Sequence, residues 1–258
     1  MEHGKFDTDV AALKQRIQAH EKYGLYDLNQ WIFDHIELEE GLSILDLGCG
    51  TGKQTLPLAK IVGDSGHVLA VDVSQDALDV LFQSAKELGL EKRISLLCIG
   101  FDDLREEHFH QQRFDRVVAS YSLYYAQCSR TVFGVVYHVM KAGSILFFCG
   151  PAKDNNSELK HFHYVLRGEQ PPIENGAPVF MEETGQQLAR EFFTTVEVFT
   201  FENPLRFDSA EALYVYWSSC NLYDKNLDAN FKAAATKHFQ THFMFETIKR
   251  VIGVKAVK

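Results

Sequence analysis

Apolar and polar positions follow two rhythms along residues 1–150. Short apolar runs, typical of strands buried on both faces, lie at residues 44–47, 67–72, 93–99, 113–120 and 144–149. Between them, apolar residues recur every three or four positions, which predicts helices over residues 56–62, 74–89 and 131–140. An earlier helical pattern over residues 10–36 is broken at Gly24. Strands that alternate with helices predict an α/β fold around a parallel sheet.

The pattern loosens after residue 150. Helices are predicted over residues 158–167, 182–192, 208–222 and 231–245, and strands over residues 194–201 and 250–257. An insertion after the fifth strand lies over the carboxyl edge of the sheet, where α/β proteins bind ligands. We therefore expect one structural domain in three parts. Residues 1–150 form the N-terminal helices and the ligand-binding core. Residues 151–245 hold helical cap insertions on the substrate side together with the remaining core helix and strand, and residues 246–258 form the final antiparallel strand.

The first strand runs directly into a glycine-rich turn. Gly48, Gly50 and Gly52 are separated by single residues, Cys49 and Thr51, and a helical pattern follows at once. Such glycines adopt positive φ and let a ligand approach without meeting a Cβ, while the helix N-terminus offers free N–H groups. The spacing differs from the G-x-G-x-x-G of dinucleotide-binding turns.

An acid stands two residues before the first glycine of this turn. The carboxylate of Asp46 would repel a pyrophosphate and attract an ammonium group. The turn therefore predicts a small charged metabolite other than a dinucleotide.

Residues 46–52, Asp-Leu-Gly-Cys-Gly-Thr-Gly, resemble motif I of the class I S-adenosylmethionine-dependent methyltransferases, (D/E)-x-G-x-G-x-G, at every fixed position. The resemblance implies a Rossmann-like three-layer sandwich with a seven-stranded, mostly parallel sheet whose last strand is antiparallel. It also implies S-adenosyl-L-methionine as cofactor, whose amino acid end suits the acid and the N–H groups of the turn. Family motifs cover residues 42–150, and the later segments follow the family by the order of elements alone.

The second strand ends in a second acid. Asp72, with Val73 after it, follows Gly52 at the interval of about 20 residues at which a βαβ nucleotide site places a ribose-binding carboxylate. The alternative role for such an Asp is to cap the next helix, although Ser74 can also do this.

Two further segments are similar to family segments around the cofactor. In Gly-Phe-Asp-Asp-Leu, residues 100–104, Asp102 is favoured over Asp103 to receive the adenine amino group, with Phe101 beside the ring. An N-cap of a short following helix is the alternative for Asp102. The fourth strand ends in Ser120 and Tyr121, which we expect beside the cofactor near its reactive methyl group.

The sequence does not decide which residue, if any, removes a proton from the acceptor. Because the donor is already activated, alignment of the reactants can supply most of the rate gain, and a base is needed only if the acceptor must lose a proton. Candidates are His161, His163 and Tyr124, for which surface exposure or packing is the alternative explanation. No metal-ligand cluster stands out in the sequence.

Charge narrows the class of acceptor. A net charge of -9 disfavours a broad phosphate-binding surface, so nucleic acid is an unlikely partner. We expect a small-molecule acceptor that is methylated on oxygen or nitrogen. A tRNA or protein acceptor, a catalytically silent cofactor-binding protein, and a NAD-dependent oxidoreductase are the alternatives.

Cysteine usage and the chain's N-terminus indicate the compartment. The five cysteines are scattered and form no C-x-x-C pair. The first residues lack the build of a signal peptide, and no apolar run is long enough to span a bilayer. The sequence therefore predicts a cytoplasmic protein without a membrane partner, and leaves its oligomeric state open.

Overall fold

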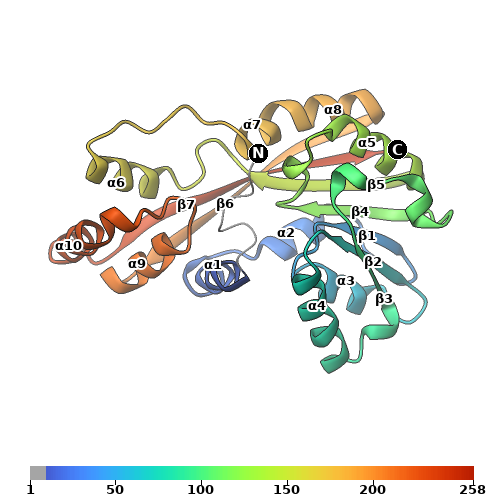
Figure 1. The fold of residues 1–258 in the computed structure, drawn as a ribbon, viewed down its shortest axis with the longest axis horizontal. Helices are drawn as coiled ribbons and strands as arrows, with labels where there is room; N and C mark the ends of the chain where they lie inside the picture. The colour runs from blue at the N-terminus through green and yellow to red at the C-terminus, as the bar shows by residue number, and fades with distance from the viewer. Residues whose placement is uncertain (1–9) are drawn as a thin grey trace.

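The computed structural model describes residues 10–258, which form a seven-stranded sheet with helices on both faces (Figure 1). The strands are β1 (Ser43–Leu47), β2 (His67–Asp72), β3 (Ile94–Cys98), β4 (Phe114–Ser120), β5 (Met140–Pro151), β6 (Thr195–Phe207) and β7 (Phe245–Val257). Their order in the sheet is β3-β2-β1-β4-β5-β7-β6. Strands β1 to β5 pair in parallel, and β7 runs antiparallel to both of its neighbours. The predicted sheet, mostly parallel with an antiparallel last strand, is confirmed.

Successive residues of each central strand enter opposite layers of the protein. Leu45 and Val117 belong to the buried cluster under α5 (Ser129–Val139) and α8 (Gly185–Phe192). Their neighbours Ile44 and Val118 belong to the cluster under α2 (Leu28–Asp34), α3 (Thr55–Ile61) and α4 (Gln75–Glu87). Burial on both faces explains why these strands read as continuous apolar runs, and it confirms the three-layer sandwich.

The remaining helices are α1 (Val10–Tyr23), α6 (Ser157–Arg167), α7 (Ala177–Val179), α9 (Ala210–Ser218) and α10 (Asp228–Phe239). The break expected at Gly24 separates α1 from α2. Two predictions from the sequence were wrong. The helix expected over residues 231–245 ends at Phe239, and the last strand begins at Phe245 rather than at residue 250. The strand expected over residues 194–201 continues to Phe207. β7 pairs with β6 from Phe245 to Val257, and this pairing overrides the local helical pattern.

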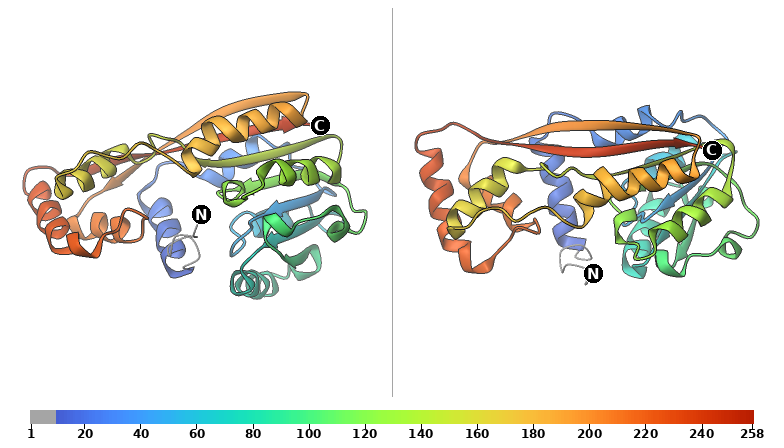
Figure 2. Two further views of the ribbon diagram at one scale, coloured as in Figure 1. Left: turned by 45° about the horizontal axis from the view of Figure 1, so that its top comes forward. Right: turned by 90° about the horizontal axis from the view of Figure 1, so that it is seen from above.

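Strands β6 and β7 form a long antiparallel pair, connected through α9 and α10, which we call the β6–β7 hairpin. This pair extends beyond the end of the neighbouring strand β5. Residues 251–257 of β7 pair with both β5 and β6, whereas residues 245–250 pair with β6 alone. The outer part of the hairpin therefore projects past the carboxyl ends of β4 and β5, together with α6, α9 and α10 (Figures 1 and 2). We call this part the extension. It has its own buried cluster, in which the rings of Trp217 and Phe231 stack at 4.0 Å.

None of the helices within the described residues is long and apolar enough to cross a bilayer.

Candidate active site

The glycine turn between β1 and α3 is fixed to β2 by its backbone. Gly48 N and Cys49 N both donate to the carbonyl of Val71, at 2.7 and 3.0 Å. All three glycines have positive φ: 73° at Gly48, 53° at Gly50 and 90° at Gly52. Glycine adopts this left-handed region without strain. The three glycines therefore stand at the positions where the backbone of the turn requires a positive φ.

The three glycines differ in what a side chain would meet. A Cβ on Gly48 would lie 2.2 Å from Ser122 Cβ, and one on Gly52 would lie 2.3 Å from Leu81 Cδ1. A Cβ on Gly50 would meet no atom of the described residues within 4 Å. Packing therefore requires glycine at positions 48 and 52, whereas Gly50 faces free space that a ligand can fill.

Asp46 lies beneath the turn and is only 1% exposed. Thr55 Oγ1 donates to Asp46 Oδ2 at 2.6 Å. Burial raises the pKa of Asp46 to about 7, and the charge of Asp72 adds to the rise, while the Thr55 hydrogen bond opposes it. A cationic group bound near the turn would favour the ionised form of this carboxyl group.

Asp72 borders the turn at the carboxyl end of β2. Its Oδ2 accepts from Gly50 N at 2.7 Å and its Oδ1 accepts from Ser74 N at 2.9 Å. A carboxylate oxygen can accept a second hydrogen bond, so both oxygens can still receive ribose hydroxyls. Ser74, rather than Asp72, caps α4, because its side chain accepts from Ala77 N. The neighbouring Val73 is 60% exposed and offers an apolar surface beside the carboxylate.

Asp102 binds backbone groups that precede α5. Its Oδ1 accepts from Gln127 N at 3.0 Å and from Cys128 N at 2.9 Å. The side chain thus ties the short 3₁₀ helix Phe101–Asp103 to the start of α5. The helix that follows, Glu106–Phe109, has Arg105 and not Asp102 at its N-cap. Its role toward adenine, with Phe101 beside the ring, stays a prediction.

The residues after β4 carry an unusual backbone conformation. Ser120 ends the strand, and Tyr121 follows with a φ of 58°. A positive φ is rare for a bulky residue, and such strained positions gather at functional sites. Tyr121 N donates to the carbonyl of Cys149 at 2.8 Å, while the Tyr121 hydroxyl is buried without a hydrogen-bond partner among the described residues.

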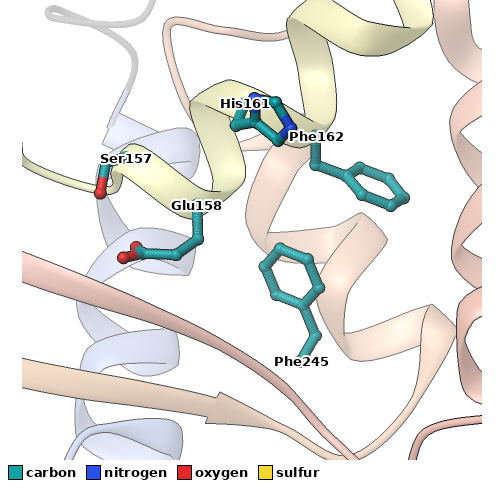
Figure 3. Close-up of a pocket in the computed structure, with 5 residues that line it drawn as sticks. All are labelled: Ser157, Glu158, His161, Phe162 and Phe245. Carbon is teal, nitrogen blue, oxygen red and sulfur yellow. The ribbon is translucent and has the colours of Figure 1, made fainter.

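The three candidate bases lie in different surroundings. His163 is 2% exposed within the extension, where Trp217 Nε1 donates to its Nδ1 at 3.3 Å, and burial lowers the pKa of His163. His161 lines a pocket of about 440 Å³ in the extension with Ser157, Glu158, Phe162 and Phe245 (Figure 3). Tyr124 is 8% exposed and packs against Tyr125 and Phe180. Burial favours packing roles for His163 and Tyr124, and the catalytic role of all three stays a prediction.

A larger cavity, of about 760 Å³, adjoins the glycine turn and was not foreseen from the sequence. Its lining brings together residues from the turn, from α1 and the segment after it, and from the β6–β7 hairpin. They include Thr51, Gly52 and Lys53 of the turn, His20 and Tyr26, and Asn203 and Lys249. The N-terminal helices thus lie beside the predicted cofactor turn.

Two polar residues of the hairpin organise this cavity. Asn203 Oδ1 accepts from Leu25 N at 2.8 Å and from Tyr26 N at 3.0 Å, which fixes the link between α1 and α2 to β6. Opposite Asn203 in the strand register is Lys249, which is 6% exposed, with Nζ 3.1 Å from His20 Nδ1. Burial, with a further contribution from the charge of Lys53, lowers the pKa of Lys249 to about 7.

One signal for Lys249 was present in the sequence. Phe245, Thr247, Lys249 and Val251 alternate along β7 and are all buried. A strand drawn from residue 245 would have placed the lysine on an inward face. Because the predicted strand began at residue 250, the signal was missed.

Within residues 10–258, no group of three or more His, Cys, Asp or Glu side chains is arranged to hold a metal ion. All five cysteines are free.

Comparison with known proteins identifies the family. The family described as "Methyltransferase domain" matches residues 38–194 of this chain. The match covers more than half of the chain and includes β1 to β5 and the glycine turn. The chain therefore belongs to this methyltransferase family, and the resemblance to class I S-adenosylmethionine-dependent methyltransferases is confirmed.

Curated relatives match in part of their length. The demethylmenaquinone methyltransferase of Lactobacillus johnsonii is 33% identical over 116 residues, which cover 44% of this chain and 46% of that protein. The ubiquinone/menaquinone biosynthesis C-methyltransferase of Haemophilus ducreyi is 27% identical over 145 residues, 55% of each chain. This chain thus spans about half the length of the curated relatives it matches.

Solved structures share the fold at low sequence identity. A putative methyltransferase from Bacillus halodurans superposes with a TM-score of 0.59 at 15% identity, covering 90% of this chain and 98% of that one. A SAM dependent methyltransferase from Aquifex aeolicus gives 0.53 at 14%, with coverages of 95% and 97%. The [4+2]-cyclase SpnF gives 0.56 at 18%, with coverages of 91% and 86%.

The cofactor of the family, S-adenosylmethionine, fits the residues present at the turn. A Cβ would fill the space that Gly50 leaves open, and the acid beneath the turn suits a ligand with an ammonium group.

Proposed function

We propose that this protein transfers a methyl group from S-adenosyl-L-methionine to a small-molecule acceptor. The open space at Gly50, between the buried Asp46 and the carboxylate of Asp72, carries this proposal. When bound, the cofactor would supply an activated methyl group on a sulfonium.

We assign the residues of the predicted cofactor site the following roles. Asp46 and the glycine turn, with the N–H groups of Cys49 and its neighbours, would hold the amino acid end. The ribose hydroxyls would bind Asp72, beside Val73. Adenine would lie next to Phe101, with Asp102 receiving its amino group. Ser120 and Tyr121 would border the methyl group.

The acceptor would enter from the carboxyl edge of the sheet. The cavity of about 760 Å³ lies there, and so does the extension. This supports residues 1–150 as the cofactor-binding part, residues 151–245 as the substrate side and residues 246–258 as the closing strand. Oxygen and nitrogen are the acceptor atoms proposed from the sequence, and the relatives named C-methyltransferases add carbon to these. The free cysteines suit a cytoplasmic location.

Calorimetric titration of the full chain with S-adenosylhomocysteine and with NAD tests the proposal directly. We expect saturable binding of the first ligand alone. Binding of NAD in its place would support the oxidoreductase alternative and refute the methyltransferase proposal. A binding assay with total tRNA at moderate salt tests the alternative acceptor. Binding of tRNA would favour nucleic acid over a small molecule as the methyl acceptor.

A catalytically silent cofactor-binding protein is the second candidate. It is favoured by one observation, because the fold is shared with a protein described as a cyclase, and a fold does not by itself fix the reaction. Such a protein would bind S-adenosylhomocysteine and yet methylate no member of a broad panel of phenols, amines, thiols and carboxylic acids.

A further inference from the structure

Lys249 is a buried amine without an acidic partner. It is 6% exposed, and no carboxylate of the described residues forms an ion pair with it. Its single hydrogen-bond partner among these residues is His20 Nδ1, at 3.1 Å. A buried amine that nothing neutralises opposes folding, so its presence at a cavity wall calls for a functional reason.

His20 connects Lys249 to a polar chain that extends into the extension. His20 Nε2 lies 3.2 Å from Tyr216 Oη, to which Asn156 Nδ2 donates at 3.0 Å. A protonated lysine can only donate, so His20 Nδ1 must accept and the ring proton must reside on Nε2, where Tyr216 Oη accepts it. In this tautomer the neutral amine of Lys249 also donates to His20 Nδ1. The lone pair of the amine therefore does not point at His20 and can accept a proton from another group.

Two unpartnered polar atoms adjoin this chain. The buried side-chain oxygens without a hydrogen-bond partner in the described residues are Glu91 Oε2, Tyr121 Oη and Asn156 Oδ1. Tyr121 lies against Lys249, whose Nζ is 5.2 Å from the centre of the Tyr121 ring. Asn156 binds Tyr216 at the other end of the chain. Buried polar atoms are nearly always paired, so these two oxygens mark an unusually polar surrounding for the buried amine, although neither residue lines the cavity.

The cluster lies beside the cofactor turn. Lys249 and His20 line the same cavity as Thr51 and Gly52. Lys249 precedes by two residues Val251, which pairs with Pro151 at the carboxyl end of β5. The amine therefore lies just beyond the carboxyl ends of the parallel strands, on the side where α/β folds bind ligands.

We propose that Lys249 is the general base of methyl transfer, that His20 positions it, and that the acceptor is a small molecule with an ionisable hydroxyl group. This inference rests on the function proposed above. In the step, the acceptor's O–H bond breaks and its proton moves to the lone pair of Lys249 Nζ. The electron pair left on the acceptor forms the bond to the methyl carbon as the carbon–sulfur bond breaks, which leaves a neutral thioether and a lysine ammonium.

The charges around Lys249 support this role. The titratable and charged groups that act on it are His20, Arg16, Lys53, Tyr121, Cys149 and Cys220. Two acids, Glu21 and Asp27, line the same cavity and act on Lys53, but neither forms an ion pair with Lys249. Burial first, and then the charges of Lys53 and Arg16, lower the pKa of Lys249 to about 7. Burial also lowers the pKa of His20 well below its usual range, so His20 stays neutral and keeps its accepting nitrogen. The amine is therefore available as a base above about pH 7.

The probe for the test is 4-nitrophenol, whose ionised form absorbs visible light. It is titrated with the full chain in the presence of saturating S-adenosylhomocysteine, and its absorbance is followed against pH. Because a lysine ammonium favours the phenolate beside it, we expect the apparent pKa of the bound probe to fall by about one unit or more. In Lys249→Met this shift should vanish while S-adenosylhomocysteine still binds within about twofold. An equal shift in wild type and Lys249→Met, or no shift in either, would overturn the inference.

Matched variants separate Lys249 from general effects. Lys255→Met removes another lysine of β7, one paired with Glu37, and should leave the probe's shift unchanged. His20→Leu removes the accepting nitrogen and should reduce the shift, whereas His20→Gln keeps a polar partner and should restore most of it. A shift that persists in His20→Leu would refute the positioning role. If S-adenosylhomocysteine fails to bind wild type, the proposed function fails, whereas binding without a shift that depends on Lys249 refutes this inference alone.

Discussion

The glycine turn and the cavity lined by Lys249 adjoin each other, yet they are built in opposite ways. The turn consists of contiguous residues, 46–52, and is fixed by backbone hydrogen bonds to β2. The cavity joins α1 to β7, and the contact between His20 and Lys249 spans 229 positions of the sequence. Each side nevertheless holds a buried group whose pKa is close to 7, raised at Asp46 and lowered at Lys249.

The difference shows which parts of a binding site this fold encodes locally and which parts need distant segments of the chain. A backbone turn needs only the right glycines and can be encoded locally. A buried amine needs a hairpin, a helix and a cavity wall to come together, so it is encoded across the whole chain. Both ionisable groups lie where burial disfavours their charge, which suits proton exchange with ligands better than stabilisation of the fold.

The largest expected effect belongs to the turn. Gly50→Val should abolish cofactor binding, with a loss on the order of 100-fold or more, because a branched side chain would occupy the open space at position 50. Gly89→Val is the matched control, since Gly89 also has positive φ and a Cβ there would meet no described atom within 4 Å, but it follows α4 away from the turn. Calorimetric titration with S-adenosylhomocysteine measures both variants. Equal affinities would exclude the turn as the cofactor site.

The second largest expected effect is a change in stability when Lys249, in the cavity wall, is replaced. The pKa of Lys249 in the folded protein, about 7, lies below its ordinary value of 10.5. The unfolded chain therefore binds this proton more tightly, and the lysine opposes folding fully below pH 7 and no longer above about pH 10.5. Lys249→Met should raise the free energy of unfolding at pH 6 by on the order of 5 kcal/mol, an advantage that shrinks as the pH rises toward 10.

Urea unfolding at pH 6 and at pH 9.5 measures this effect. Lys255→Met removes a partly buried lysine that is paired with the exposed Glu37, and it should change stability by less than about 1 kcal/mol at both pH values. If the Lys249→Met protein is less stable than wild type at pH 6, Lys249 is not a buried amine whose charge opposes folding.

These two regions also explain how far the sequence could predict the molecule. The strand, glycine turn and helix around Gly50 were predicted because their signals lie within a few residues of one another. The hydrogen bond between the buried Asp46 and Thr55 was not predicted, because Thr55 lies nine residues further along the chain, on the helix after the turn. His20 and Lys249 were missed because neither has a partner nearby in the sequence. Their contact depends on the path of β7, which pairing with β6 determines over its whole length.

An intermediate effect is expected at the border of the turn. Asp72→Ala should weaken cofactor binding by roughly 1–3 kcal/mol, because it removes charge-assisted hydrogen bonds to the ribose and the contact that orders Gly50 N. Asp72→Asn keeps one accepting oxygen and should lose less. Asp76→Ala, which removes an exposed acid in the first turn of α4, should bind like wild type. If titration shows Asp72→Ala and Asp76→Ala to be equivalent, Asp72 does not bind the ribose.

The smallest effect distinguishes the two ionisable groups. Near pH 7 about half of the Asp46 carboxyl groups carry a proton, because burial raises their pKa to about 7. The ammonium group of bound S-adenosylhomocysteine would favour the carboxylate, so binding should release about half a proton per site at pH 7 and almost none at pH 9. Calorimetry in buffers of different ionisation enthalpy counts these protons. Asp46→Asn should abolish the release, and Lys249→Met should keep it because this ligand has no sulfonium charge. A release that disappears in Lys249→Met and persists in Asp46→Asn would assign the proton to the cavity instead of the turn.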